Sequence, residues 1–203
     1  KYHLIVVKST VIPGTTDNNV TKIIENYSKK DVVNDFGICM NPEFLREGSA
    51  INDFMSPDRI VIGSSDQKSL DLMQQIYKPF SGVDILTTNN KTAEMIKYTN
   101  NSLLATLISF SNEIGNLCAS QKDIDVIDVM KGVHLDHRIS PITEGLNRVQ
   151  PGIVSYLQAG CGFGGSCFPK DVKALIAHGN AYNQEMELLR SVMHINEHQP
   201  SKV

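Results

Sequence analysis

The apolar pattern of the 203-residue chain changes at Thr92, and this change limits the folds open to it. Before Thr92, short runs rich in valine and isoleucine alternate with segments of helical spacing. Such alternation favours a mostly parallel sheet with helices on its faces. The predicted strands are residues 4–7, 36–40, 59–63 and 83–86, and the predicted helices are residues 18–29, capped by residues 15–17, and a helix capped by residues 65–66 that runs to about Tyr77.

After Thr92, apolar residues recur at steps of three and four from Leu103 to Leu117, which predicts one helix over residues 91–120. At ~1.5 Å per residue this helix is ~45 Å long, a length that usually connects domains or subunits. The second half of the chain is therefore predicted to be all-α. Its other expected helices run from Asp123 to about Lys131, from Pro169 onward, and from about Gln184 toward Pro200.

Composition excludes several classes of protein. The chain is 41% apolar and 20% charged with a net charge of −3, which is typical of a globular protein and not of a disordered one. Its 19 basic residues are outnumbered by 22 acidic ones, so bulk charge does not favour nucleic-acid binding. A membrane-length apolar run and a signal-peptide cleavage site are both absent from the sequence, and a cytoplasmic location is expected.

Cysteine usage argues against a metal centre and against a disulfide scaffold. Cys39, Cys118, Cys161 and Cys167 form no CxxC pair, and His134 and His137 are spaced too loosely to suggest metal ligands. We expect no metal. Cys39, in an apolar strand, and Cys118, on the long helix, are expected to be core residues.

Cys167 is the most informative residue. It ends a glycine-rich loop, residues 160–167, and precedes a helix with Pro169 in its first turn. A thiol at a helix N-terminus faces unpaired N–H groups and the positive end of the helix dipole, which lowers its pKa and prepares a nucleophile. A small buried thiol that closes a tight turn explains this position equally well.

Two further groups could carry chemistry. Lys97 and Asn101 lie one helical turn apart and would suit an oxyanion, although spacing alone favours a solvated polar face. Residues 41–48 follow a predicted strand, where α/β proteins bind ligands, and Glu43 and Glu47 could act in acid–base chemistry. A capped turn is the simpler interpretation of this segment.

Four segments occur in one order: residues 8–15 (KSTVIPGT), 41–48 (NPEFLREG), 93–101 (AEMIKYTNN) and 162–171 (GFGGSCFPKD). In sequence and spacing they resemble the UDP-glucose/GDP-mannose 6-dehydrogenase family, and the resemblance covers nearly the entire chain. It implies an α/β part followed by an all-α part, and NAD as the cofactor.

The implied domains are residues 1–90, the C-terminal part of an NAD-binding Rossmann-like domain with the second half of its parallel sheet, and residues 91–203, a central helical domain for dimerisation and catalysis. The implied partners are a nucleotide sugar and a second copy of the chain, joined through the 91–120 helix. UDP-glucose is favoured over GDP-mannose by the look of residues 43–58.

The resemblance also implies a covalent reaction. The family oxidises a primary alcohol of a nucleotide sugar to a carboxylate with two NAD⁺ and without releasing the aldehyde. Cys167 would attack the aldehyde to give a thiohemiacetal, whose oxidation yields a thioester that water hydrolyses. Lys97 and Asn101 would stabilise the oxyanion, and Glu43 would act as a general base.

The residues implied by the resemblance fall into three sets. The catalytic set is Cys167, Lys97, Asn101, Asp171, Glu43 and Thr10, of which Asp171 and Thr10 would order a water. The substrate set is Glu43, Phe44, Leu45, Lys97, Asn101, Gln158, Phe163, Gly164 and Arg138, the last from a neighbouring subunit. The cofactor set is Thr10, Glu47 and Lys170.

The chain departs from the family pattern in several places. Residues 141–151 look inserted, and Cys161 lies close enough to Cys167 in sequence to suggest an inactivating disulfide on oxidation. The glycine-rich run at residues 160–165 follows a loop and not a predicted strand, so it is no Rossmann fingerprint, and we expect these 203 residues alone to have little or no activity. A non-catalytic dimerisation module of the same fold is the alternative. A cysteine hydrolase is disfavoured because His178 lies about three turns along the helix from Cys167.

Overall fold

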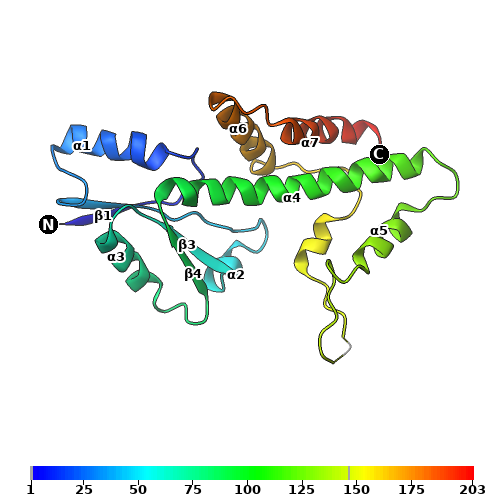
Figure 1. Cartoon of the computed structure of the whole chain (residues 1–203), viewed down its shortest axis with the longest axis horizontal. Helices are drawn as coiled ribbons and strands as arrows, with labels where there is room; N and C mark the ends of the chain where they lie inside the picture. The colour runs from blue at the N-terminus through cyan, green and yellow to red at the C-terminus, as the bar shows by residue number, and fades with distance from the viewer. Residues whose placement is uncertain (1, 146) are drawn as a thin grey trace. The chain divides into compact units, whose positions relative to one another are not determined.

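The computed structural model describes residues 2–145 and 147–203. The chain forms two compact units, Lys1–Thr99 and Asn100–Val203, and Figure 1 shows the order of their helices and strands. Within the described residues, no helix is long and apolar enough to cross a membrane.

A four-stranded sheet is the centre of the first unit. Its strands are β1 (His3–Val7), β2 (Phe36–Met40), β3 (Arg59–Gly63) and β4 (Asp84–Thr88), in the order β1-β2-β3-β4. β1 pairs with β2 in parallel, as β3 does with β4, whereas β2 and β3 are antiparallel at Met40↔Gly63. The sheet is therefore mostly parallel, as predicted, with an antiparallel junction that was not. The connection after β2, residues 41–58 with a short helix inside it, is long enough for a crossover but starts and ends at the same edge of the sheet, as antiparallel pairing requires.

Both helices predicted before residue 90 are present, and one unpredicted helix lies between them. A π-helical turn (Thr16–Thr21) continues into α1 (Lys22–Ser28), and α3 covers Gln67–Tyr77, capped by Asp66 as predicted. The short helix α2 (Ala50–Met55) was not predicted.

The predicted cap of the first helix was wrong. None of residues 15–17 caps it; the Glu94 carboxylate accepts hydrogen bonds from Gly14 N (2.5 Å), Thr16 N (2.8 Å) and the Thr16 hydroxyl (2.7 Å) instead. A partner distant in sequence has therefore replaced the local one.

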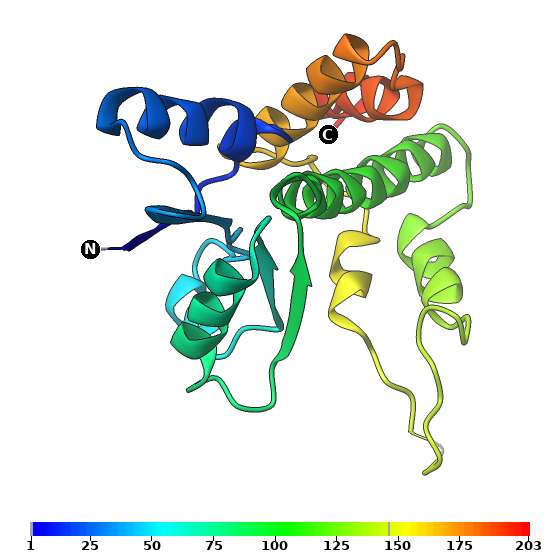
Figure 2. The same ribbon diagram turned by 60° about the vertical axis from the view of Figure 1, so that its left-hand side comes forward.

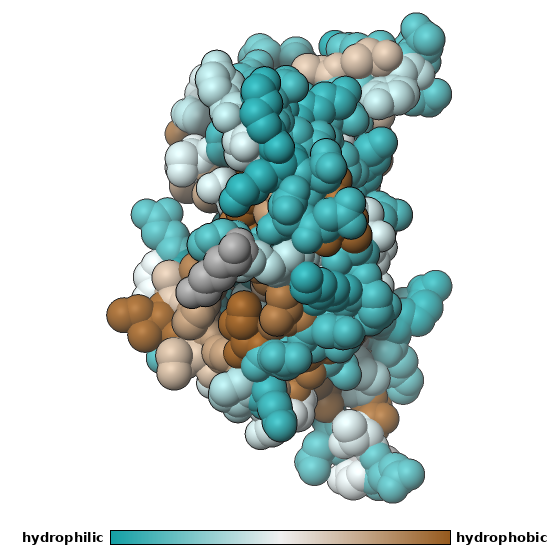
Figure 3. Space-filling model, turned by 90° about the vertical axis from the view of Figure 1, so that its left-hand side faces the viewer, coloured by the Kyte–Doolittle hydropathy of each residue, from teal (hydrophilic) through white to brown (hydrophobic). Residues whose placement is uncertain are grey.

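Alternation along the strands divides the core between the two faces of the sheet. Cys39, Ile60 and Ile62 pack with Met73 of α3 on one face, and Met40 and Val61 pack with Ala93 on the other. α3 contacts β2 and β3 (Figure 2), and the π-helical turn contacts β2. On the face drawn in Figure 3, hydrophilic residues cover most of the surface, and hydrophobic residues are exposed in several smaller areas between them.

The second unit is helical. The thirty-residue helix α4 (Asn90–Ala119) agrees with the predicted 91–120 helix and enters this unit at Asn100. It is followed by α5 (Val126–His134), a 3₁₀ turn (Gly152–Tyr156), α6 (Phe168–Ala181), α7 (Glu187–His198) and a 3₁₀ turn (Gln199–Ser201). α6 packs on α7, and the Ser109 hydroxyl of α4 donates to the Val192 carbonyl of α7 at 3.0 Å.

The cap of α5 corrects another prediction. Asp125, not Asp123, precedes the helix, and its carboxylate accepts from the Ile127 amide. Asp123 has a φ of 64°, in the left-handed region that aspartate tolerates better than most residues, so it belongs to the turn before the helix.

Candidate active site

Asn41 fixes the point where β2 ends. Its amide N donates to the Val7 carbonyl (2.9 Å), and its side-chain Nδ2 donates to the Val61 carbonyl (2.7 Å). Lys8 Nζ (2.7 Å) and the Tyr77 hydroxyl both donate to its Oδ1. The backbone amide and the buried carboxamide of Asn41 thus tie this end of β2 to β1, β3 and α3. The segment that follows β2 starts from a rigid position.

That segment brings Glu43 and Phe44 to Lys97. Lys97 Nζ lies 3.4 Å from Glu43 Oε1 and 5.3 Å from the centre of the Phe44 ring, whose other cationic neighbour, Arg59, lies at 3.9 Å. Lys97 is only 6% exposed, so it is not part of a solvated polar face. Glu43 Oε2 also accepts from the Leu45 amide (2.7 Å), so the predicted turn and an ion pair exist together.

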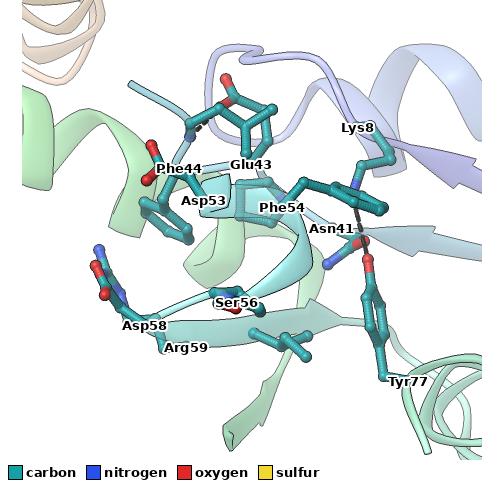
Figure 4. Close-up of a pocket in the computed structure, with 14 residues that line it drawn as sticks. Lys8, Asn41, Glu43, Phe44, Asp53, Phe54, Ser56, Asp58, Arg59 and Tyr77 are labelled. Atoms are coloured by element: carbon teal, nitrogen blue, oxygen red, sulfur yellow. Dashed lines mark hydrogen bonds between the residues drawn. The ribbon is translucent and has the colours of Figure 1, made fainter. Parts of the chain in front are cut away.

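A pocket of about 50 Å³ lies beside this segment, as Figure 4 shows. Asp53 of α2 closes one side of it, held by the amide and guanidinium of Arg46. These contacts hold the pKa of Asp53 well below its usual range. The pocket is lined by Lys8, Asn41, Pro42, Glu43, Phe44, Leu45, Asp53, Phe54, Ser56, Pro57, Asp58, Arg59, Ile60 and Tyr77.

In the second unit, Cys167 is the residue immediately before α6, with Pro169 in the first turn as predicted. It is exposed, so it is not a buried thiol that closes a turn. Its Sγ lies 3.8 Å from the Ser166 hydroxyl. Cys161 is exposed too, whereas Cys39 and Cys118 are buried, as predicted, and burial raises the pKa of Cys39 to about 11.

Asp171 lies one turn into α6, and its amide donates to the Cys167 carbonyl at 2.9 Å. Its side chain is 1% exposed. Asn101 Nδ2 donates to one carboxylate oxygen (2.7 Å) and Lys170 Nζ to the other (2.5 Å). Asn101 is itself buried, so here too a solvated polar face is excluded. The carboxylate is held in one orientation beside the turn that carries the thiol.

The other candidate residues are distributed as follows. Arg138 is exposed and forms a two-pronged ion pair with Asp136, at 2.5–3.2 Å, that holds the pKa of the Asp136 carboxyl well below its usual range. Phe163 is buried. Gln158 and Gly164 are exposed in the second unit, as Glu47 is in the first, where Thr10 is half-buried. Arg138 is thus paired locally and not with another residue of the candidate sets.

Sequence reasoning missed several residues of the site, among them Asn41 and Arg59. Asn41 stands between a strand and a proline, a position that could have indicated a side chain needed to hold the end of the strand. Arg59 starts a strand and carries no local signal of its contact with Phe44.

Family models match both units. A model described as the central domain of the UDP-glucose/GDP-mannose dehydrogenase family matches residues 91–198, and the model of that family's NAD binding domain matches residues 1–81. The chain belongs to the UDP-glucose/GDP-mannose dehydrogenase family. Dehydrogenases of this family use NAD.

Individual members of the family are similar over almost the whole chain. A UDP-glucose 6-dehydrogenase of Haloferax volcanii is 39% identical over 99% of this chain and 44% of its own length. A GDP-mannose 6-dehydrogenase of Pseudomonas aeruginosa is 40% identical over 98% of this chain and 43% of its own. A solved UDP-glucose dehydrogenase from Pyrobaculum islandicum superposes with a TM-score of 0.84 at 39% identity, covering 97% of this chain and 41% of that one. The chain therefore spans less than half the length of these relatives.

One edge of the sheet in the first unit is of the kind at which α/β proteins bind NAD. β1 and β2 run in parallel register, so the residues that follow them, including Thr10, leave the same edge of the sheet, where α/β proteins bind ligands. The phosphates do not fit the helix after β1, because Glu94 already accepts from the amides of Gly14 and Thr16 at its start.

Proposed function

We propose that this chain carries the catalytic centre of an NAD-dependent dehydrogenase that oxidises the C6 alcohol of UDP-glucose to the carboxylate of UDP-glucuronate. The first turn of α6 is the observation that supports this most. It combines an exposed Cys167 with a buried Asp171 that Asn101 and Lys170 hold in place. An open thiol and a fixed carboxylate are what formation and hydrolysis of a thioester need.

The residues act in the following order. Glu43, already paired with Lys97, takes up the proton that leaves the C6 hydroxyl as the alcohol becomes an aldehyde. Cys167 Sγ then bonds to C6, and Lys97 and Asn101 stabilise the oxygen of the thiohemiacetal. Oxidation of this adduct gives a thioester. A water oriented by Asp171 and Thr10 attacks C6, the C–S bond breaks, and the thiolate leaves with the carboxylate formed. Bound NAD supplies the hydride acceptor, one molecule for each oxidation.

The remaining candidate residues would position substrate and cofactor. We propose that Phe44, Leu45, Gln158, Phe163 and Gly164 surround the nucleotide sugar, that Glu47 and Lys170 lie near the cofactor, and that Arg138 reaches the substrate of a neighbouring subunit. GDP-mannose is the second candidate substrate, because the similar relatives include a GDP-mannose 6-dehydrogenase.

We also propose a cytoplasmic homodimer formed through α4. Leu103, Phe110 and Leu117 recur on α4 at steps of seven residues and are 48–55% exposed. Steps of seven place them on one side of the helix, where a second copy could cover them.

The test is NADH formation by the protein expressed from its full reading frame, with UDP-glucose or GDP-mannose as substrate. We expect about two NADH per UDP-glucose, and a more than about 100-fold lower rate for Cys167→Ala. The 203 residues alone should form little or no NADH, because none of the strands β1 to β4 is followed by a Gly-x-Gly-x-x-Gly turn for the phosphates. A non-catalytic module would form no NADH in any length of chain, which would refute the proposal.

A further inference from the structure

Side-chain carboxamides hold the glycine-rich loop before Cys167 at two of its residues. The Gly160 amide donates to Asn112 Oδ1 of α4 (2.7 Å), and its carbonyl accepts from Gln199 Nε2 (2.8 Å). Asn116 Nδ2 donates to Gln199 Oε1 (2.9 Å) and so fixes which way the Gln199 amide points. Asn112 thus holds the N–H of Gly160 and Gln199 holds its C=O, and each of these two residues is at most 3% exposed.

Phe163 is held in the same two-sided way by one residue. Its amide donates to Asn196 Oδ1 of α7 (2.7 Å), and its carbonyl accepts from Asn196 Nδ2 (2.9 Å). Gly162, between the two held residues, has a φ of +93°, and a Cβ there would come within 2.6 Å of Asn196 Oδ1. Only glycine fits this approach.

The rest of the loop is different. Gly164 and Gly165 have open space on the side where a Cβ would be, and residues 164–167 are all exposed. The two ends of this short stretch are nevertheless linked. The buried Phe163 ring packs edge-on against the ring of Phe168, the first residue of α6, with centroids 5.9 Å apart.

We infer that Asn196, Gln199 and Asn112 are positioning residues for Cys167, an inference that rests on the proposed function of that thiol. Asn196 fixes the Phe163 backbone, the Phe163 ring braces Phe168, and Phe168 starts the helix whose first turn presents the thiol. Glycines 164 and 165 then span two fixed points. Fixing both ends lowers the entropy that the loop loses when it takes its working shape.

The test measures amide hydrogen exchange by NMR in the unchanged 203-residue chain and in its Asn196→Ala and Phe168→Leu variants. The reporter is the Asp171 amide, which donates to the Cys167 carbonyl. In Asn196→Ala we expect the Phe163 and Asp171 amides to exchange about tenfold faster or more, the change expected from losing one or two hydrogen bonds. In Phe168→Leu, Asp171 should exchange faster while Phe163 stays protected.

Two comparisons separate positioning from a general loss of stability. Glu197→Gln changes the neighbouring residue of α7, which pairs with Lys173 at the surface (3.1 Å), and should leave both amides unchanged. The double variant Asn196→Ala/Phe168→Leu should raise Asp171 exchange no further than Phe168→Leu alone, because both changes break one chain of contacts. Additive effects, or an unchanged Asp171 amide in Asn196→Ala, would overturn the inference.

Kinetics of the protein from its full reading frame complete the test. Asn196→Ala should lower kcat for NADH formation about tenfold while KM for NAD changes less than about twofold, because the thiol is misplaced and the cofactor contacts are not. A rise in KM for NAD as large as the fall in kcat would count against positioning. If no variant and not even the unchanged protein forms NADH, the proposed function fails, while hydrogen exchange still decides whether Asn196 holds the first turn of α6.

Discussion

Glu94 provides the most quantitative test of the first unit, through the substitution Glu94→Gln. Its carboxylate is fully buried and accepts three hydrogen bonds, one from Gly14 N and two from Thr16. Glutamine has nearly the same shape, but one carboxylate oxygen becomes an NH₂ donor. Whichever way the amide is placed, at least one of the buried donors that Glu94 now satisfies loses its acceptor.

The expected cost follows from those contacts. If the glutamine oxygen stays with Thr16, two charge-assisted hydrogen bonds become neutral ones, which are about half as strong. Gly14 N then faces another donor, and an unmade buried hydrogen bond costs about 1–3 kcal/mol. Removal of a buried charge returns part of this, since burying an ion costs several kcal/mol. We expect the free energy of unfolding of the first unit to fall by about 2–4 kcal/mol.

Hydrogen exchange of the amides in the fully buried strand β2 measures the stability of the first unit. Exchange of the amides in α6 serves as an internal reference, because α6 belongs to the second unit. Thr16→Val removes one hydroxyl bond to Glu94 and should cost about 1 kcal/mol. Glu113→Gln, at an exposed glutamate of α4, should change nothing. If Glu94→Gln changes the unfolding free energy by less than about 0.5 kcal/mol, the usual range of surface substitutions, the reasoning is refuted.

Three other expectations are simpler to test. Burial raises the pKa of the Cys39 thiol to about 11, so between pH 9 and 11 the thiol ionises in the unfolded chain before it does in the folded one, and the free energy of unfolding should fall. The fall is about 1.4 kcal/mol per pH unit at most and should be smaller in Cys39→Ala. Equal slopes for the two proteins in urea titrations would contradict this expectation. Asn101→Leu leaves one oxygen of buried Asp171 without its donor, and should lower the free energy of unfolding of the second unit by about 1–3 kcal/mol in the same titrations, whereas a neutral result would mean that water replaces the amide. Phe110→Glu should turn a dimer into a monomer in light scattering, and a monomeric unchanged protein would exclude the proposed α4 interface.

Elements with strong local patterns could be predicted from the sequence. The four strands, the thirty-residue helix and the start of α6 at Pro169 each depend on apolar spacing or on backbone chemistry within a few residues. Cys39 and Cys118 were predicted to be buried for the same reason, since each lies within an apolar pattern. Helix α2 was missed because its six residues leave Ile51, Phe54 and Met55 exposed and so show no amphipathic period.

Caps and strand direction were less predictable, because alternatives compete at short range. Thr15, Thr16 and Asp17 are all good capping residues by type, but Glu94 satisfies the same donors from 78 residues away. Asp123 and Asp125 both precede α5, and only the backbone conformation of the turn decides between them. Likewise, the apolar content of β2 and β3 is the same whether they run parallel or antiparallel.

Site residues divide along the same line. Cys167 could be proposed because its neighbours in sequence create its setting: a glycine-rich loop before it and a helix after it. The carboxamides that hold that loop have no such local signal. Asn196 meets Phe163 across 33 residues, Gln199 meets Gly160 across 39, and Asn112 meets Gly160 across 48. The sequence gives one weak signal of such carboxamides: a polar residue such as Asn112 lies among the apolar positions of a long helix. Since a buried carboxamide is costly unless paired, such a residue predicts a partner, and only the fold can say which.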